Sequence, residues 1–309
     1  MSKKLIQRLK AARRVLLVTH TDPDADALGS CLLCRALIRR LNPQARVSIS
    51  IDPKHKGELN YFLQRIKNPA GRPDTIVAVD ASSAPRLYGL DNLPVDIMFD
   101  HHVGNANFGK INIVDPQAAS CTLVIYKLLQ QLKIKLTKPM AEALYLGLCS
   151  DTGNFSFANT DERVFRAALD CTRAGIKPNA IFNRLNEQLE RREIMDFARA
   201  LLSTESHCGG RLIVASIPAD SKVDNRNLID YIRREKHAEA ALVLVAKKDH
   251  IKISFRSKTA LNVAQIAAHF NGGGHKKAAA GKISGKTLAE ARKELLAYFS
   301  KYIFPPNKT

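Results

Sequence analysis

The sequence predicts an α/β protein of two domains, on three observations. Apolar runs of four to six residues end in a histidine or an acid, as strands buried in a parallel sheet do. Segments whose apolar residues have helical spacing alternate with these runs. This alternation is typical of proteins in which helices cover both faces of a parallel sheet. The pattern changes after residue 208, and 309 residues is long for one core. We expect an N-terminal parallel-sheet domain with helices on both faces, a helical linker and a smaller C-terminal α/β domain with a mixed sheet.

The first predicted domain, residues 1–185, alternates strands with helices. Leu5 and Leu9 stand four residues apart, as on one face of a helix, whereas the strands are continuous apolar runs. The predicted strands are Val15–Thr19, Val47–Ile51, Thr75–Asp80, Val95–Asp100 and Ile111–Val114. The predicted helices cover residues 2–12, 27–41, 60–66, 118–132, 139–150 and 161–174.

The segment before Asp151 has two interpretations. Tyr145–Cys149 is as apolar as the predicted strands and leads directly into Ser150 and Asp151. Pro139, however, favours the first turn of a helix, and a helix that starts there ends near Ser150. Both interpretations place Asp151 at the end of an apolar segment.

The remaining chain contains a predicted linker, residues 186–208, and a predicted second domain, residues 209–309. Residues 178–206 have helical spacing with no strand between the helices. Two strands, Leu242–Ala246 and His250–Arg256, are expected to pair antiparallel around a turn. The other elements expected there are a strand at Arg211–Ile217, a helix at Val263–Phe270, a short strand at Ile283 and a helix at Leu288–Tyr302.

The chain is strongly basic, with a formal net charge of +19. Residues 209–309 carry 19 lysines and arginines against 8 acids, a net charge of +11, and residues 1–208 carry a net +8. Such an excess is typical of proteins with an anionic partner, and a polyanion such as RNA fits it. A generally basic proteome would account for the same excess without a partner.

The cysteine pattern favours buried core residues over a metal site or a redox pair. Cys31 and Cys34 have the spacing of half a zinc site or a redox pair, but no second pair of that spacing follows. Because both lie in an apolar predicted helix, we interpret them as small buried residues.

The predicted location is the cytoplasm. No apolar run approaches the ~20 residues that cross a bilayer, so we expect no membrane association. The apolar run Val15–Val18 is also too short for the core of a signal peptide.

An acid-rich segment follows the first predicted strand. His20 is followed by Asp22, Asp24 and Asp26, and Gly29 and Ser30 come next. Carboxylates so close together repel one another unless a cation neutralises them, and carboxylate and imidazole are ligands for Mn²⁺, Mg²⁺ or Fe²⁺. The alternative is a solvated turn in which Asp26 caps the next helix.

Similar residues follow the other buried segments. Ligands of open α/β sheets bind beyond the carboxyl ends of the strands, where residues from several strands meet. We therefore expect one edge of the sheet to gather His20, Asp24, Asp26, Asp80, His101 and Asp151.

These motifs resemble those of DHH-superfamily phosphoesterases. The four segments HTDPDADALGS, VDAS, DHH at Asp100–His102, and SDTGNF occur in the order found in that family. GGGHKKAAAG at Gly272–Gly281 resembles the signature of the DHH-associated C-terminal domain. The resemblance covers nearly the whole chain, and its closest type is the bacterial group that degrades very short RNA and the bisphosphate pAp.

The resemblance implies two divalent metal ions, Mn²⁺ with Mg²⁺ as the alternative. Asp80 and Asp151 would bridge the ions, which suits a reaction that needs both a nucleophile and relief of negative charge. The ligands of one ion would be His20, Asp24, Asp80 and Asp151, and those of the other Asp26, Asp80, His101 and Asp151.

The resemblance also implies two catalytic candidates, His102 and Asp100. His102 would face the substrate, where an imidazole can bond the phosphate or carry a proton. Asp100 would orient a neighbouring ligand. Asp22 lies outside the ligand set of the family, and we expect it to support a ligand or cap the loop.

A further set of candidates lies in the second domain. Glycines allow backbone amides to approach a phosphate or ribose closely, and an arginine can pair with phosphate through two bonds. The expected substrate-binding residues are Arg256, Ser257, Gly272, Gly273, Gly274 and His275. Lys276 and Lys277 fit an exposed surface equally well.

The expected activity is hydrolysis of short oligoribonucleotides to mononucleotides and removal of the 3′-phosphate of pAp. The alternatives are a cyclic di-AMP or pApA phosphodiesterase, a RecJ-like single-strand exonuclease and an inactive nucleic-acid-binding module. A complete two-metal ligand set argues against the inactive module. The oligomeric state is left open between a monomer and a homodimer.

Overall fold

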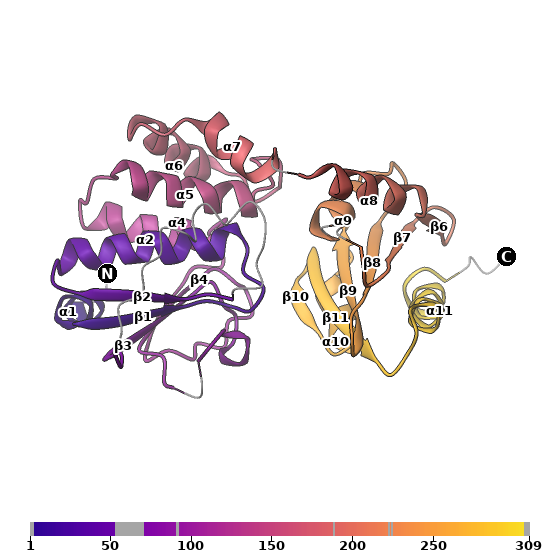
Figure 1. The fold of residues 1–309 in the computed structure, drawn as a ribbon, viewed down its shortest axis with the longest axis horizontal. Coiled ribbons are helices and arrows are strands. Elements are labelled where there is room, and N and C mark those ends of the chain that lie inside the picture. The colour runs from indigo at the N-terminus through magenta and orange to yellow at the C-terminus, as the bar shows by residue number, and fades with distance from the viewer. Residues whose placement is uncertain are drawn as a thin grey trace. The chain divides into compact units, whose positions relative to one another are not determined.

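The computed structural model describes residues 3–52, 71–90, 93–187, 189–221, 223 and 225–305. The chain forms two compact units, residues 1–188 and 189–309, each with its own sheet (Figure 1). This confirms the predicted α/β class, with a parallel sheet in the first unit and a mixed sheet in the second. The predicted helix at residues 60–66 lies outside the described residues.

The N-terminal sheet has five parallel strands in the order β2-β1-β3-β4-β5. Its two inner strands β3 and β4 are completely buried, as their continuous apolar sequences predict. β2 and β3 lie on opposite sides of β1, so the strand order reverses at β1 and a ligand is expected beyond the ends of β1 and β3. The strands are β1 Arg14–Val18, β2 Arg46–Ser50, β3 Thr75–Val79, β4 Ile97–Asp100 and β5 Ile111–Val114.

The two faces of this sheet have different covers. Leu17, Val77 and Phe99 point into the large core that also contains helix α2, and helices α2, α5 and α6 are stacked outward on that side (Figure 1). Val18 and Met98 point the other way into a smaller core. The helices are α1 Lys3–Ala11, α2 Ala25–Leu41, α4 Cys121–Gln131, α5 Lys138–Asp151, α6 Glu162–Arg173 and α7 Pro178–Asn186.

Among the described residues, the smaller core is closed by the 3-10 turn η1 (Ala84–Arg86) and its flanking loops, through Leu87 and Val95. The expected helical cover is therefore seen on one face, in α2 and α4. Residues 53–70, which connect β2 with β3, are not described.

The C-terminal sheet has six strands in the order β10-β11-β9-β8-β7-β6. β7 and β8 are parallel, whereas the other neighbouring pairs are antiparallel. The antiparallel pairing of β8 with β9 is as the sequence predicts. The strands are β6 Glu205–His207, β7 Leu212–Ile217, β8 Ala240–Ala246, β9 His250–Ser257, β10 Gly273–His275 and β11 Ala278–Ser284.

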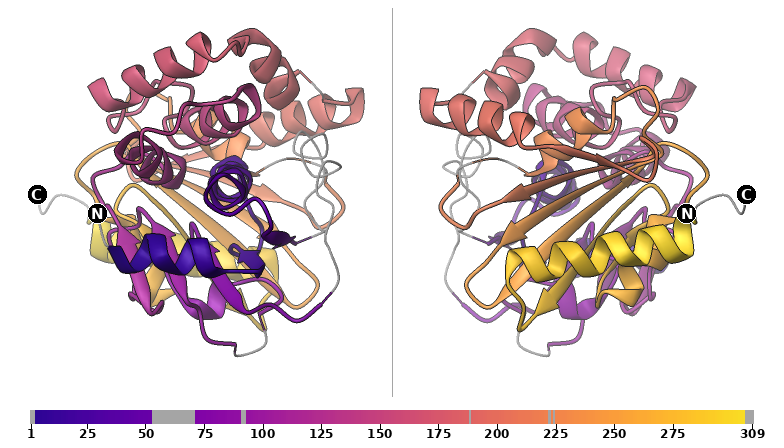
Figure 2. Two further views of the ribbon diagram at one scale, coloured as in Figure 1. Left: turned by 90° about the vertical axis from the view of Figure 1, so that its left-hand side faces the viewer. Right: turned by 90° about the vertical axis from the view of Figure 1, so that its right-hand side faces the viewer.

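Helices cover both faces of this second sheet. α8 (Arg191–Leu202) and α9 (Asn225–Ile232) pack on one face, and α8, which starts within the predicted linker, contacts β7 and α9. α10 (Val263–His269) and α11 (Leu288–Tyr298) close the other face, where α11 lies across the strands (Figure 2, right). After Tyr298 the last predicted helix changes into a π-helical turn, η2 (Phe299–Ile303).

The structure corrects the strand interpretation of Tyr145–Cys149, because this run is part of helix α5. α5 packs against α2, α4 and α6. Because it has neighbours on several sides, most of its surface is buried and its sequence is apolar nearly all round. The segment therefore has the composition of a buried strand without being one.

Neither Cys31 nor Cys34 is in a disulfide, and both are buried within α2, where burial raises the pKa of the Cys34 thiol to about 12. None of the described helices is long and apolar enough to cross a membrane.

Candidate metal centre

The carboxyl ends of three neighbouring strands bring the predicted ligands together. His20 follows β1 and forms an isolated bridge with Leu87. Asp80 follows β3, and His101 and His102 follow β4. Asp24 and Asp26 lie at the start of α2, and Asp151 ends α5.

Asp80 is at the centre of the cluster. Its ligand atoms lie within 4.8 Å of those of His20 with Asp24, of Asp26 with His101, and of Asp100 with His102. Its backbone has a φ of 53° in the left-handed region, which aspartate tolerates better than most residues. Its side chain is buried, and no described residue donates a hydrogen bond to Oδ1. A buried carboxylate oxygen without a donor is suited to a cation.

Asp26 is held by a helix that begins 95 residues later in the chain. Its two carboxylate oxygens accept hydrogen bonds from the backbone amides of Cys121 at 2.7 Å and Thr122 at 3.1 Å, at the N-terminus of α4. The helix dipole favours an anion at this position. The alternative in which Asp26 caps α2 is wrong, because Asp24 is the cap and accepts from the amides of Asp26 and Ala27.

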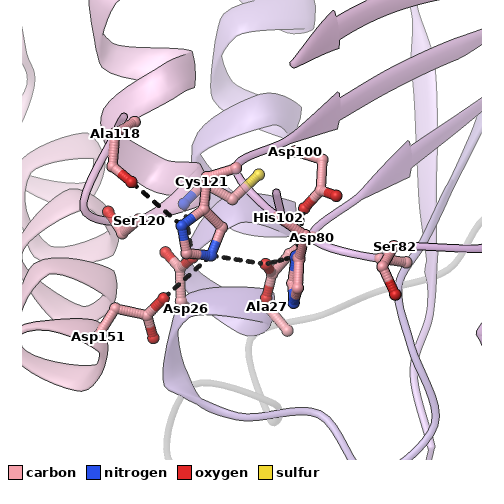
Figure 3. A network of polar contacts seen from close by, with 12 residues as sticks. Asp26, Ala27, Asp80, Ser82, Asp100, His102, Ala118, Ser120, Cys121 and Asp151 are labelled. Carbon is pink, nitrogen blue, oxygen red and sulfur yellow. Dashed lines mark hydrogen bonds and ion pairs between the residues drawn. The ribbon is translucent and has the colours of Figure 1, made fainter. Parts of the chain in front are cut away.

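His101 is oriented toward three acids. Its Nδ1 lies 3.2 Å from the carbonyl oxygen of Ala118, so Nδ1 carries the proton and Nε2 is the nitrogen that faces the acids. Nε2 lies 3.1 Å from Asp151 Oδ2, 3.5 Å from Asp80 Oδ1 and 4.0 Å from Asp26 Oδ2. The surrounding acids are seen together in Figure 3.

His20 has the same arrangement at the other side of Asp80. Its Nδ1 lies 2.8 Å from the carbonyl oxygen of Thr21, and its Nε2 lies 3.7 Å from Asp80 Oδ2. In both histidines a backbone carbonyl therefore selects Nε2 as the nitrogen that faces the acids.

His102 is paired differently. Its Nδ1 lies 2.7 Å from Oδ1 of Asp100, which is fully buried. Asp100 therefore contacts His102 rather than one of the predicted metal ligands, and its orienting role stays a prediction. Asp22, by contrast, is exposed and has a φ of 57° in the loop before α2.

The acids and histidines of the cluster perturb one another. Burial opposes the charged form of His20, but Asp80 and Asp24 outweigh it and raise its pKa to about 9. Burial raises the pKa of Asp151 to about 6, although His101 opposes this. Burial and the neighbouring Asp151 and Asp80 likewise raise the pKa of Asp26. The cluster keeps protons that a cation would displace.

The donor set fits divalent metal ions. Carboxylate oxygens and imidazole nitrogens suit hard or borderline ions such as Mg²⁺ or Mn²⁺. Oδ1 of Asp80 adds an acceptor that the described residues leave unsatisfied.

The predicted residues of the second unit share one face of its sheet. His275 pairs with Ala278, and Ala278 pairs with Arg256, so all three side chains lie on the same face. Arg256 Nε lies 3.2 Å from Asp230 Oδ1, and Ser257 Oγ donates to the carbonyl oxygen of Thr259.

The glycines before His275 have a packing reason. A Cβ on Gly272 would lie 1.9 Å from the carbonyl oxygen of Ala280, and Gly274 has a φ of 144°. Gly273 is exposed, and a Cβ there would have no described atom within 4 Å. At Gly272 and Gly274 the close approach is therefore to β11, whatever else the segment binds.

Two contributors to the centre are not predicted from the sequence. Asn105 donates to the buried Asp100, and Gly147 of α5 lies where a Cβ would be 2.2 Å from Asp26 Oδ1. No local pattern signals either residue, because asparagine is common in loops and a single glycine within a helix seldom marks a site.

Comparison with known proteins agrees with this geometry. Residues 14–148 match the N-terminal domain of the DHH family, and residues 209–303 match the DHHA1 domain. The bifunctional oligoribonuclease and PAP phosphatase NrnA of Thermus thermophilus is 30% identical over 289 residues, which cover 91% of this chain and 88% of that protein. The protein of the same name from Bacillus subtilis is 24% identical over 294 residues, covering 92% and 93%.

One solved structure has the same fold over nearly its whole length. An exopolyphosphatase-related protein from Bacteroides fragilis aligns with a TM-score of 0.80 and 19% identity, covering 96% of this chain and 95% of that one. The resemblance inferred from the five motifs is confirmed by these matches. With both domains matched and a relative 30% identical along most of its length, the chain belongs to the DHH family.

Proposed function

We propose that this chain, a hydrolase acting on phosphoester bonds, degrades short oligoribonucleotides to mononucleotides and removes the 3′-phosphate of pAp. The observation that carries the proposal is the place of Asp80, which is shared by separate histidine-and-acid groups. Two metal ions ~4 Å apart can hydrolyse a phosphoester, and a carboxylate shared by two groups of ligands would hold two ions side by side. The relatives named for these two activities supply the substrate class.

The proposed metal ligands follow from the two groups around Asp80. His20 and Asp24 hold one ion, Asp26 and His101 hold the other, and Asp80 serves both. The family resemblance adds Asp151 as a second shared ligand, and its Oδ2 lies 3.1 Å from His101 Nε2. The donor chemistry favours Mn²⁺, with Mg²⁺ as the alternative. When bound, the ions supply a nucleophile at neutral pH and neutralise negative charge on the phosphate.

His102 is proposed to act on the substrate. A carboxylate only accepts hydrogen bonds, so the contact with Asp100 places the proton of His102 on Nδ1 and makes Nε2 the nitrogen that meets the substrate. At Nε2 the imidazole can accept or return a proton during cleavage. Asp100 holds the ring in that tautomer.

The second unit is proposed to bind the remainder of the substrate. Arg256 and His275 lie on one sheet face of a unit with a net positive charge, which suits a phosphate-bearing ligand. Ser257 and the segment Gly272–Gly274 complete the proposed binding residues.

The proposed location is the cytoplasm, and a homodimer remains an open alternative to a monomer.

One kinetic panel tests the function. The purified chain with Mn²⁺ is incubated with pAp, pApA, cyclic di-AMP, RNA of 5 and 24 nucleotides and single-stranded DNA, and kcat/KM is compared. Highest values for pAp and the shortest RNA support the proposal. A preference for cyclic di-AMP, for long single strands, or binding without hydrolysis would instead support one of the alternatives named from the sequence.

A further inference from the structure

Asn105, in the loop after β4, uses its whole side-chain amide. Its Nδ2 donates to Asp100 Oδ2 at 2.5 Å and to the carbonyl oxygen of Ala81 at 3.1 Å. Its Oδ1 accepts from the backbone amide of Asn107 at 2.7 Å. Because carboxylate and carbonyl oxygens only accept and the backbone amide only donates, these three partners determine the orientation of the amide.

The carboxylate of Asp100 depends on this amide. Asp100 is fully buried, and a buried carboxylate is costly unless both oxygens receive hydrogen bonds. His102 supplies the donor to Oδ1 at 2.7 Å, and Asn105 supplies the donor to Oδ2. The three side chains form a chain in the order Asn105, Asp100, His102.

His102 has a second carboxylate within reach. Its Nδ1 lies 3.8 Å from Asp80 Oδ1, an oxygen that accepts no hydrogen bond from the described part of the chain. A rotation of the Asp100 carboxylate would weaken the first contact and favour the second. His102 would then bond to the acid that the two proposed metal groups share.

We propose that Asn105 is a positioning residue for the reaction. By fixing the carboxylate of Asp100, it keeps His102 paired with Asp100, away from Asp80, and aims Nε2 at the substrate. This inference rests on the proposed function in that His102 meets the substrate. It adds a residue that lies outside the predicted ligand and substrate sets.

The first test compares Asn105 with Asn112 of β5, whose amide also binds the loop between β4 and β5. Asn112 binds the backbone of Asn107 and Gly109 through its amide, so Asn112→Ala removes a similar number of hydrogen bonds without touching Asp100. We expect Asn105→Ala to lower kcat on pAp by about 10–100-fold with little change in KM. Asn112→Ala should stay within about twofold of the parent. Equal effects of the two variants on kcat would overturn the proposal.

A double-mutant cycle separates positioning from general support of the fold. If Asn105 acts through His102, then Asn105→Ala should cost nothing further in a His102→Ala background. If the two losses multiply, Asn105 does not act through His102 and the proposal fails.

A spectroscopic readout keeps the inference separate from the proposed function. In the Mg²⁺-loaded parent with ¹⁵N-labelled histidine, His102 should show a proton on Nδ1, and Asn105→Ala should shift or broaden this signal more than Asn112→Ala does. An unchanged His102 signal overturns the positioning role even where Asn105→Ala is less stable. A parent that hydrolyses nothing in the substrate panel would refute the proposed function, while this signal would still test the contact.

Discussion

The two units of the chain place charge in opposite ways. The N-terminal unit buries Asp26, Asp80 and Asp100, and the ligand atoms of Asp26 and of Asp100 each lie within 4.8 Å of those of Asp80. In the C-terminal unit Arg256 and Arg233 share Asp230 Oδ1, at 3.2 and 3.1 Å, so each arginine already has an acidic partner in the same unit. The clustered acids of the first unit need a cation to neutralise them. Arg256 of the second unit already pairs with Asp230 and is suited to exchange that carboxylate for an anionic ligand.

The strongest test of this contrast is Asp80→Ala. Since Asp80 belongs to every histidine-and-acid group of the centre named above, its loss removes the shared ligand of both proposed ions. We expect hydrolysis of pAp to fall by about three orders of magnitude or more, with circular dichroism close to that of the parent. Activity within tenfold of the parent at full metal loading would contradict the two-metal assignment.

The success of sequence analysis differs between the units for a physical reason. The strands of the first unit are continuous apolar runs because both faces are buried, as in β3 and β4. Two strands of the second unit, β6 and β10, are three residues long and polar or glycine-rich. They form because the edges of β7 and β11 are available for pairing, and the local sequence of β6 and β10 does not indicate this.

Helix α9 is an element that the sequence prediction does not contain. Leu228, Ile229 and Ile232 have helical spacing and are buried, which is the pattern of a helix packed on one face. They are three apolar residues in a short polar segment, so the local pattern is too short to specify the helix before its packing on the sheet is known.

The candidate ligands are predictable because they stand at the ends of apolar segments. Their support is not, because it depends on where distant segments meet. The amides that hold Asp26 belong to Cys121 and Thr122, and the carbonyl that orients His101 belongs to Ala118. Only the packing of α4 beside α2 brings these groups together.

Arg256→Ala tests the other side of the contrast. One charge-assisted contact to phosphate is worth about 1.5–3 kcal/mol, so we expect kcat/KM on pAp and dinucleotides to fall by about 10–150-fold. Hydrolysis of bis-p-nitrophenyl phosphate should stay close to the parent, because the metal ligands are unchanged. Kinetics on both substrates make the measurement.

Arg233→Ala is the matched control, since it removes the other partner of Asp230 and leaves Arg256 in place. It should affect pAp hydrolysis less than Arg256→Ala does. Equal losses on both substrates for Arg256→Ala would mean that Arg256 supports the fold or the centre rather than the substrate.

Gly147→Ala perturbs the centre without removing a ligand. The added Cβ would lie 2.2 Å from Asp26 Oδ1 and 2.3 Å from Thr122 Oγ1, so Asp26 or α5 must move. We expect Mn²⁺ affinity to fall by roughly tenfold and stability by about 1–3 kcal/mol, measured by calorimetry and denaturant unfolding. Gly104→Ala, where a Cβ has no described atom within 4 Å, should change neither. Parent-like Mn²⁺ affinity in Gly147→Ala would show that the position of Asp26 matters little.

The pH dependence of Mn²⁺ affinity tests the acidic centre without any substitution. Because the neighbouring acids raise the pKa of His20 to about 9, its ring is an imidazolium with protons on both nitrogens in the metal-free protein at pH 7 to 8. Its Nδ1 faces the carbonyl oxygen of Thr21, so the proton to be displaced is the one on Nε2, beside Asp80.

Binding of an ion must release this proton, so affinity should rise by up to about tenfold per pH unit between pH 6.5 and 8.5 and level off above pH 9. Asp151, with a pKa of about 6, adds to the loss of affinity only at lower pH. Mn²⁺ titrations followed by electron paramagnetic resonance at several pH values give the slope, and His20→Gln should flatten it while lowering affinity. A parent slope of zero across this range would show that His20 gives up no proton when the ion binds. The contrast between an acidic centre that holds displaceable protons and a basic unit whose arginines already pair with an acid would then lose its main consequence.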